Sequence, residues 1–243
     1  MDSKPFLTIA IPTMRRWSFL KDSLPLMLER EEVGEIVVCD ETGEDATMIE
    51  QHISSHKLRV VRNESRLGIY HNKRKALSLA TMPLVAILDS DNVFSDTWFD
   101  VLSDAVKEKG LRTLYGSPAF HSINLSTGKV WQPCKSFEGL LLHKACWNEI
   151  FRKQFWNHLL NDGNWVVPKE CIRCLPEVVP PAYVDGATYC DAMYMLRCFI
   201  EAGYMIYYVP DLAYNHLVHE QSSWLTRESA SNKAIQTTPW LLK

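Results

Sequence analysis

The residues of this sequence best suited to chemistry are two aspartates, Asp89 and Asp91, which flank Ser90. They follow the apolar run Leu84–Leu88, which predicts a buried strand that ends at these carboxylates. Carboxylate oxygens are preferred ligands of Mg²⁺ and Mn²⁺, and substrate phosphates often complete the coordination shell. The spacing therefore favours a site for a metal and a phosphate, although such a pair also occurs as a polar strand end or a helix N-cap.

The elements around this pair alternate between strands and helices. Apolar runs predict strands at Phe6–Ile11, Glu35–Cys39, Leu58–Val61 and Leu84–Leu88, and helical spacing predicts helices at Arg16–Leu28, Glu44–Ser54, Ile69–Ala80 and Asp96–Lys109. This order predicts a Rossmann-like, mostly parallel α/β sheet flanked by helices. Ligands of such sheets bind outside the carboxyl ends of the strands, so Thr13 and Asp40 are expected to lie near residues 89–91.

The second half of the sequence is less regular. Strands are predicted at Leu111–Phe120 and Lys129–Gln132, a helix at Thr188–Ala202 and a last strand at Tyr204–Val209. The stretch Asn157–Pro181 is predicted to be mostly loop. We expect a single domain with a regular half, 1–118, and a less regular half, 119–243.

Composition limits the class of protein. The chain has 243 residues, of which 47% are hydrophobic and 23% charged, as in ordinary soluble globular proteins. Its formal net charge of -3 argues against a broad electrostatic interaction with nucleic acid. We expect no membrane span or signal peptide, and seven scattered cysteines favour a cytoplasmic protein. Cys171 and Cys174 have C-x-x-C spacing but no second pair nearby, so we interpret them as structural.

Four segments in the first half resemble the family-2 glycosyltransferases of the A-type fold. They are Ile11-Pro12-Thr13, the acidic stretch Val37–Asp45, Asn63–Gly68 with its following helix, and Asp89-Ser90-Asp91. The resemblance implies a nucleotide-diphosphate sugar as donor, with Asp40 accepting a hydrogen bond from its base. It also implies a divalent metal, Mn²⁺ or Mg²⁺, held by Asp89 and Asp91. The residues implied to contact the donor are Pro12, Thr13, Asp40, Arg66, Lys73, Asp89 and Ser90.

The second half is similar to the same family's late signature, in the segments 190–197, 202–204 and 209–211 and in His216. This similarity implies that Asp191 is the catalytic base and that His216 is a further metal ligand. The sequence departs from the family pattern where Cys190 replaces an acid, Lys73 an arginine and Arg74 an asparagine, and where Met14-Arg15 replaces an aromatic-Asn pair. A helix-start acid and a structural histidine are the alternative interpretations, and Asp185 is the reserve candidate for the base.

The resemblance implies transfer of a sugar onto a glycan or another hydroxyl acceptor, with inversion. The chemistry agrees, since a carboxylate at a helix start can take the acceptor proton. One alternative is a haloacid-dehalogenase-like phosphatase with Asp89 as nucleophile, although its Asp-x-Asp normally follows the first strand. Another is a non-catalytic nucleotide- or glycan-binding module on the same fold. Sugar-1-phosphate nucleotidyl transfer is disfavoured because 12–16 lacks a glycine-rich loop. Peripheral contact with a membrane and the oligomeric state are left open.

Overall fold

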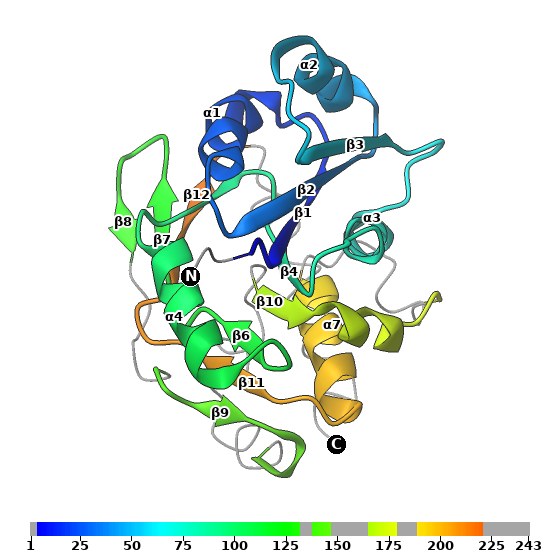
Figure 1. Ribbon diagram of the computed structural model, residues 1–243. Helices are drawn as coiled ribbons and strands as arrows, with labels where there is room; N and C mark the ends of the chain where they lie inside the picture. Colours follow the sequence, from blue (N-terminus) through cyan, green and yellow to red (C-terminus); the bar gives the residue numbers. More distant parts are fainter. Residues whose placement is uncertain (1–3, 132–137, 147–164, 179–188, 221–243) are drawn as a thin grey trace.

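The computed structural model describes residues 4–131, 138–146, 165–178 and 189–220, which form two β-sheets with helices packed around the larger one (Figure 1). The larger sheet has the strand order β3-β2-β1-β4-β10-β6-β11-β9. Its strands are β1 (Leu7–Thr13), β2 (Val33–Asp40), β3 (Leu58–Arg62), β4 (Leu84–Ile87), β6 (Leu114–Gly116), β9 (Leu141–Leu142), β10 (Trp165–Pro168) and β11 (Ile206–Tyr208).

The strands β3, β2, β1 and β4 are mutually parallel, and β11 is parallel to β6. Strand β10 runs antiparallel between β4 and β6, and β9 runs antiparallel to β11. The mostly parallel α/β sheet predicted from the sequence is therefore confirmed. Strands from both sides of residue 118 share this sheet, so the two halves of the sequence form one body.

Alternating side chains of the central strands build a hydrophobic core on each face of the sheet. Ile9 and Ile11 pack on one face with helices α1 (Trp17–Leu28), α2 (Glu44–His52) and α4 (Trp98–Lys109). Ala10 faces the other core, with α3 (Ile69–Ser78), the short 3₁₀ helix η2 (Lys169–Cys174) and α7 (Tyr189–Glu201). Figure 1 shows α1 and α4 on one side of the sheet and α3 and α7 on the other. Period-2 alternation in strands that are buried on both faces produces this three-layer arrangement.

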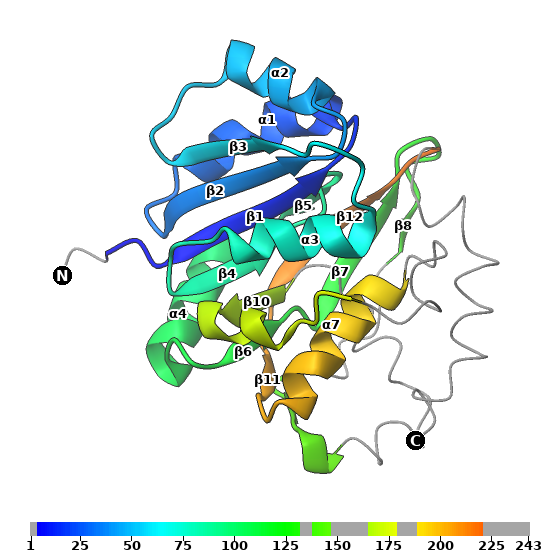
Figure 2. The same cartoon turned by 90° about the vertical axis from the view of Figure 1, so that its right-hand side faces the viewer.

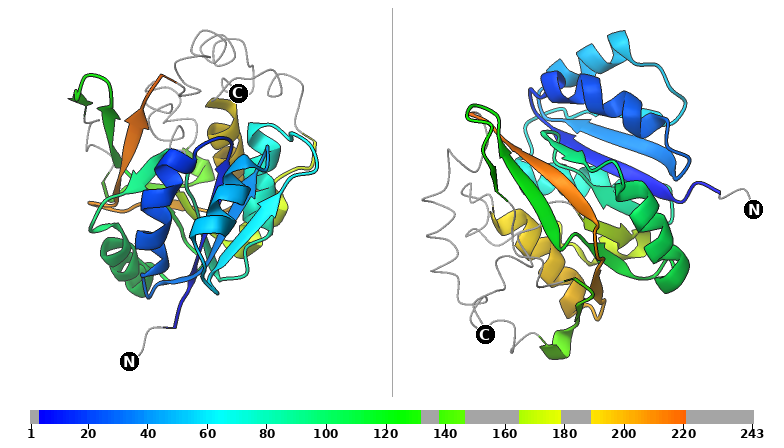
Figure 3. Two further views of the ribbon diagram at one scale, coloured as in Figure 1. Left: turned by 90° about the horizontal axis from the view of Figure 1, so that it is seen from above. Right: turned by 90° about the vertical axis from the view of Figure 1, so that its left-hand side faces the viewer.

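The smaller sheet stands at the carboxyl edge of the larger one. Its order is β5-β12-β7-β8, formed by β5 (Asn92–Phe94), β7 (Ala119–Asn124), β8 (Val130–Trp131) and β12 (Ala213–Val218). Strands β5, β7 and β12 follow β4, β6 and β11 in the chain, and Figure 3 shows β7 and β12 side by side. Because β5 begins directly after Asp91, this sheet brings β12 to the predicted carboxylate site.

Predicted boundaries in the first half agree with the structure to within a few residues, but two predictions in the second half were wrong and one strand there was missed. The predicted loop Asn157–Pro181 contains β10, which lies in the interior of the larger sheet. Its four residues are too few to show a strand period. The predicted strand Leu111–Phe120 is two strands, β6 and β7, which join different sheets on either side of Pro118. Strand β12 was not predicted.

The described cysteines of the two 3₁₀ helices form no disulfides. A short 3₁₀ helix, η1 (Lys144–Cys146), follows β9, and there Cys146 Sγ lies 3.0 Å from His143 Nε2. Cys171 and Cys174 of η2 are both free thiols.

A search of the described helices finds none with the length and apolar character needed to cross a membrane.

Candidate active site

The turn after β1 is held by a carboxylate from the neighbouring turn. Asp45, at the start of α2, accepts hydrogen bonds from the backbone N–H groups of Arg16 and Trp17 at 2.8 Å and from the hydroxyl of Thr13. These N–H groups belong to the first turn of α1, whose own N-cap position, Arg16, makes no side-chain cap. Arg15 has a φ of 58°, a left-handed conformation that is unusual for a residue other than glycine. Asp45 therefore fixes the turn that carries Arg16.

The predicted base-binding residue Asp40 lies at the end of β2 and is fully buried. Its Oδ1 accepts a hydrogen bond from the backbone N–H of Thr42 at 3.0 Å, and its Oδ2 accepts one from Ala46 at 2.9 Å. The carboxylate thus shapes the turn between β2 and α2. Contact between Asp40 and a nucleotide base stays a prediction.

The adjacent acid, Glu41, connects this turn to the loop before α3. Its Oε2 accepts a hydrogen bond from the backbone N–H of Leu67 at 2.6 Å. Burial raises the pKa of Glu41, and hydrogen bonds from the Leu67 and Gly68 backbone partly oppose the rise. Arg66 lies exposed in the same loop, where its charge also acts on Glu41. The loop therefore carries Arg66 at the surface of the carboxyl edge.

Lys73 joins two of the predicted site carboxylates. Its Nζ lies 2.8 Å from Asp89 Oδ1 and 2.6 Å from Asp191 Oδ2. The side chains of Lys73 and Asp191 are only 7% and 5% exposed, whereas that of Asp89 is 32% exposed. Apart from this ion pair, neither oxygen of Asp191 has a hydrogen-bond partner among the described residues. Residues 73, 89 and 191, predicted from three separate segments, thus form one group in which Lys73 contacts both carboxylates.

Opposing effects act on the ionisation of this group. Burial lowers the pKa of Lys73, but the charges of Asp191 and Asp89 outweigh it, so the net pKa is raised and the ammonium stays charged. Burial raises the pKa of Asp89, and Lys73 opposes the rise. Helices α3 and α7 bring the group together, since they lie side by side on one face of the sheet (Figure 2) and their Tyr70 and Tyr194 rings are 5.8 Å apart.

Asp91, the second acid of the pair, faces two basic side chains. His219 Nε2 lies 3.0 Å from Asp91 Oδ2, and Arg16 Nε lies 3.4 Å from the same oxygen. Burial raises the pKa of Asp91, but the hydrogen bond from His219 and the charges of Arg16, His219 and His216 lower it below its usual value. Asp91 is therefore ionised at neutral pH.

His216 reaches the same place through strand pairing. It lies opposite Asn92 in the β12–β5 ladder, and its Nδ1 is 3.0 Å from Asn92 Oδ1. An amide oxygen only accepts, so this contact assigns the proton to Nδ1 and makes Nε2 the unprotonated nitrogen. Burial lowers the pKa of His216, against the opposite effect of Asp91 and Asp89, and favours this neutral form.

The donor types at this edge suit a divalent cation. Carboxylates and a neutral imidazole whose other nitrogen is hydrogen-bonded to an oxygen are typical metal ligands. Within the described ranges, however, no three His, Cys, Asp or Glu side chains stand in position to hold an ion by themselves. The residue types fit a metal whose shell is completed by substrate oxygens or water.

Sequence reasoning missed two residues that contact Asp91. Arg16 lies three residues after β1, and His219 follows β12, a strand that was not predicted. Of the other predicted contacts, Pro12 and Ser90 occupy the same edge, at the ends of β1 and β4. The reserve base Asp185 lies outside the described residues.

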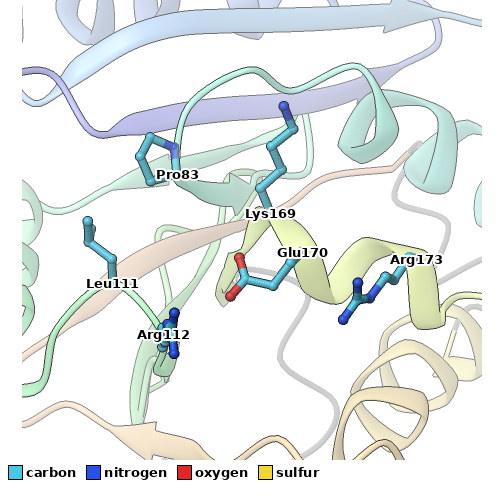
Figure 4. Close-up of a pocket in the computed structure, with 6 residues that line it drawn as sticks. All are labelled: Pro83, Leu111, Arg112, Lys169, Glu170 and Arg173. Atoms are coloured by element: carbon cyan, nitrogen blue, oxygen red, sulfur yellow. The ribbon is translucent and has the colours of Figure 1, made fainter.

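A pocket of about 700 Å³ lies at the opposite, amino edge of the sheet (Figure 4). It is lined by Pro83, Leu111, Arg112, Lys169, Glu170 and Arg173. Pro83 precedes β4 and Leu111 precedes β6, so this pocket and the carboxylates occupy opposite ends of the strands. It contains none of the predicted site residues.

The parallel sheet, the Asp-x-Asp after β4 and the carboxylate of α7 together define the A-type glycosyltransferase fold. The model of the family described as "Glycosyl transferase family 2" matches residues 8–158. The chain therefore belongs to glycosyl transferase family 2. In agreement, the Asp-x-Asp follows the fourth strand of the chain, whereas that of a haloacid-dehalogenase-like phosphatase normally follows the first.

Solved structures share this fold at low sequence identity. The S. aureus TarS fragment 1–349 in complex with UDP-GlcNAc has a TM-score of 0.63 and 14% identity, over 98% of this chain and 66% of that chain. GalNAc-T7 with UDP, GalNAc and Mn²⁺ has a TM-score of 0.59 and 14% identity, over 89% of this chain and 44% of that chain. The chain thus covers less than two thirds of each of these chains.

A curated relative, "Uncharacterized protein MT1568" of Mycobacterium tuberculosis (strain CDC 1551 / Oshkosh), is 29% identical over 92 residues. That alignment covers 37% of this chain and 29% of the relative.

Proposed function

We propose that this protein transfers a sugar from a nucleotide-diphosphate sugar to a hydroxyl acceptor, with inversion at the sugar carbon. The observation that carries the proposal is the contact of Asp89 and Asp191 through Lys73 at the carboxyl edge of the sheet. Residues more than a hundred positions apart converge there, in the region where parallel α/β sheets bind ligands. Family membership supports the same reaction class.

Asp191 is the residue we assign to proton transfer. Inversion requires the acceptor hydroxyl to attack the face of the sugar opposite the leaving diphosphate, and a carboxylate at that face can take the hydroxyl proton. Asp191 is buried in the first turn of α7, on a different element from the Asp-x-Asp that follows β4. Apart from the contact with Lys73, its oxygens have no hydrogen-bond partner among the described residues, which leaves Oδ1 available to a substrate hydroxyl.

Asp91 and His216, with Asp89 beside them, are the residues we assign to a divalent metal such as Mn²⁺ or Mg²⁺. When bound, the metal supplies positive charge that neutralises the leaving diphosphate. Asp91 contributes an ionised carboxylate to this group. His216 contributes Nε2, because its Nδ1 is engaged by Asn92.

The donor we propose first is a UDP-sugar. TarS has been solved with UDP and with UDP-GlcNAc, and GalNAc-T7 with UDP, GalNAc and Mn²⁺, so these ligands are reasonable probes. Thr13 and Arg66 border the same edge, and Asp40 is the proposed partner of the base. The acceptor is assigned only by chemistry, as a glycan or another hydroxyl compound.

The proposal is tested by incubating the purified chain and Mn²⁺ with a panel of UDP-sugars and hydroxyl acceptors, with detection of released UDP and glycosylated product. We expect UDP release that depends on the acceptor. Two other outcomes contradict the proposal in different ways. Binding of UDP-sugars without turnover of any panel member indicates a non-catalytic module, and an acid-stable acyl phosphate on Asp89 indicates a phosphatase.

A further inference from the structure

The bridge made by Lys73 is hard to reconcile with a base that is ready to act. The Lys73 ammonium lies 2.6 Å from Asp191 Oδ2, so this oxygen is already engaged by a cation and is not open to an acceptor hydroxyl. The same ammonium contacts Asp89 at 2.8 Å, so one cation satisfies two carboxylates that otherwise repel each other. In this structure Oδ2 of Asp191 is therefore blocked as a base by its ion pair with Lys73.

The exposed fractions of the three side chains indicate how the ion pair between Lys73 and Asp191 can be broken. Asp89 is one-third exposed, while Lys73 and Asp191 are almost fully buried, so a ligand approaches the group from the side of Asp89. A lysine ammonium is a compact charge on a flexible stem with three donors, and it can change partners with little movement of its helix. A diphosphate placed at Asp89 offers several charged oxygens to this ammonium.

We propose that Lys73 is a positioning residue that exchanges Asp191 for the donor diphosphate, so that the base is released only when the donor is bound. This inference rests on the proposed function and adds an order of events, with the donor binding before the acceptor is activated. The exchange breaks no covalent bond and moves no proton. It replaces one ion pair, between Lys73 and Asp191, by another between Lys73 and a phosphate oxygen.

The exchange makes a prediction that does not depend on activity. In the wild type, UDP binding has to break the contact between Lys73 and Asp191, so removing the charge of Asp191 makes binding tighter. We expect Asp191→Asn to bind UDP with Mn²⁺ about 5- to 20-fold more tightly than wild type, a coupling of ordinary size between two linked sites. In a Lys73→Met background, Asp191→Asn should give no such gain. Inorganic pyrophosphate with Mn²⁺ should show the same pattern.

The controls separate this exchange from a merely structural ion pair. Glu201→Gln, at the far end of α7, should leave UDP affinity unchanged. Lys73→Arg should keep the gain on Asp191→Asn, while Lys73→Met should raise the donor KM and lower kcat. If Lys73→Met alone does not fold, the same comparison is made in a Lys73→Gln background, which also lacks the ammonium.

Calorimetric titrations of UDP and of pyrophosphate decide the proposal. Unchanged or weaker UDP binding by Asp191→Asn overturns the exchange, as does an equal gain in the Lys73→Met background. If the wild type binds neither UDP nor pyrophosphate in the presence of Mn²⁺, the proposed donor site itself has failed. If the wild type binds UDP but Asp191→Asn shows no gain, only the exchange has failed. The two failures are therefore distinguishable.

Discussion

Asp45 and Asp191 are both buried carboxylates at the carboxyl edge of the sheet, but they are bound in different ways. Asp45 accepts hydrogen bonds from two backbone N–H groups and a hydroxyl. Asp191 is matched by the side-chain ammonium of a single lysine. Backbone donors cannot leave without unfolding a turn, whereas a side-chain cation can change partners. The comparison teaches that the type of partner separates carboxylates that hold the fold from carboxylates available to a substrate.

The largest expected effect is on the Asp191 side of this comparison. Asp191→Asn removes the group that takes the acceptor proton, so we expect sugar transfer to fall by about 10²- to 10⁴-fold although UDP binding is not weakened. Product formation under single-turnover conditions measures this loss. Glu201→Gln on the same helix is the matched control, and near-normal turnover by Asp191→Asn would assign the base elsewhere, with Asp185 as the next candidate.

On the Asp45 side, the expected effect is on stability. Asp45→Ala leaves the N–H groups of Arg16 and Trp17 without their acceptor, so the free energy of unfolding should fall by about 3 kcal/mol. Urea denaturation measures this change. Glu44→Ala is the control, because its ion pair with Arg15 is exposed and should change stability by less than about 0.5 kcal/mol. If both variants lose little stability, Asp45 does not hold the turn.

Asp91, like Asp191, is held by side chains and not by backbone N–H groups, so its substitution tests whether such carboxylates bind the donor. Asp91→Ala should weaken Mn²⁺-dependent UDP binding by at least about 10- to 100-fold, the range known for losing even indirect metal partners. The fold should persist, since no backbone N–H bond to Asp91 is seen among the described residues. Asp96→Asn, an exposed acid nearby, is the control for thermal-shift titrations with and without Mn²⁺. Equal UDP affinity in the two variants would remove Asp91 from the site.

Glu41 gives the smallest effect, and its sign depends on pH. Burial raises its pKa, so the folded state favours the protonated form, and this contribution is present at low pH and lost as pH rises through the folded-state pKa. Glu41→Gln keeps an acceptor for Leu67 without the buried charge. We therefore expect a Tm gain of about 1–2 °C at pH 7 that disappears toward pH 4, with the exposed Glu64→Gln showing none. A gain that grows in acid contradicts this account.

The sequence was informative where local patterns decide the structure. Apolar strand runs such as Leu84–Leu88 identified the parallel sheet, and the topological rule placed residues 89–91 at its carboxyl edge. It was less informative where distant segments close the sheet. The four residues of β10 carry no readable period, and β12 is half-buried, so its side chains do not alternate cleanly between polar and apolar.

The candidate site shows the same division. Lys73, Asp89 and Asp191 were identified by type and motif, and the structure brings them into contact. The partners of Asp91 could not be predicted, because Arg16 and His219 reach it through a left-handed turn and an unpredicted strand. Nor could the sequence show that both carboxylate oxygens of Asp40 accept hydrogen bonds from backbone N–H groups of the turn that follows it.

The most direct test of the central claim is the position of Mn²⁺ and UDP in a crystal of this protein, with the metal located by anomalous scattering. The account predicts an Mn²⁺ peak within about 2.0–2.3 Å of an Asp91 carboxylate oxygen and of a diphosphate oxygen of UDP. Binding of UDP and Mn²⁺ at the amino edge, beside Arg112, Lys169 and Arg173, would contradict it.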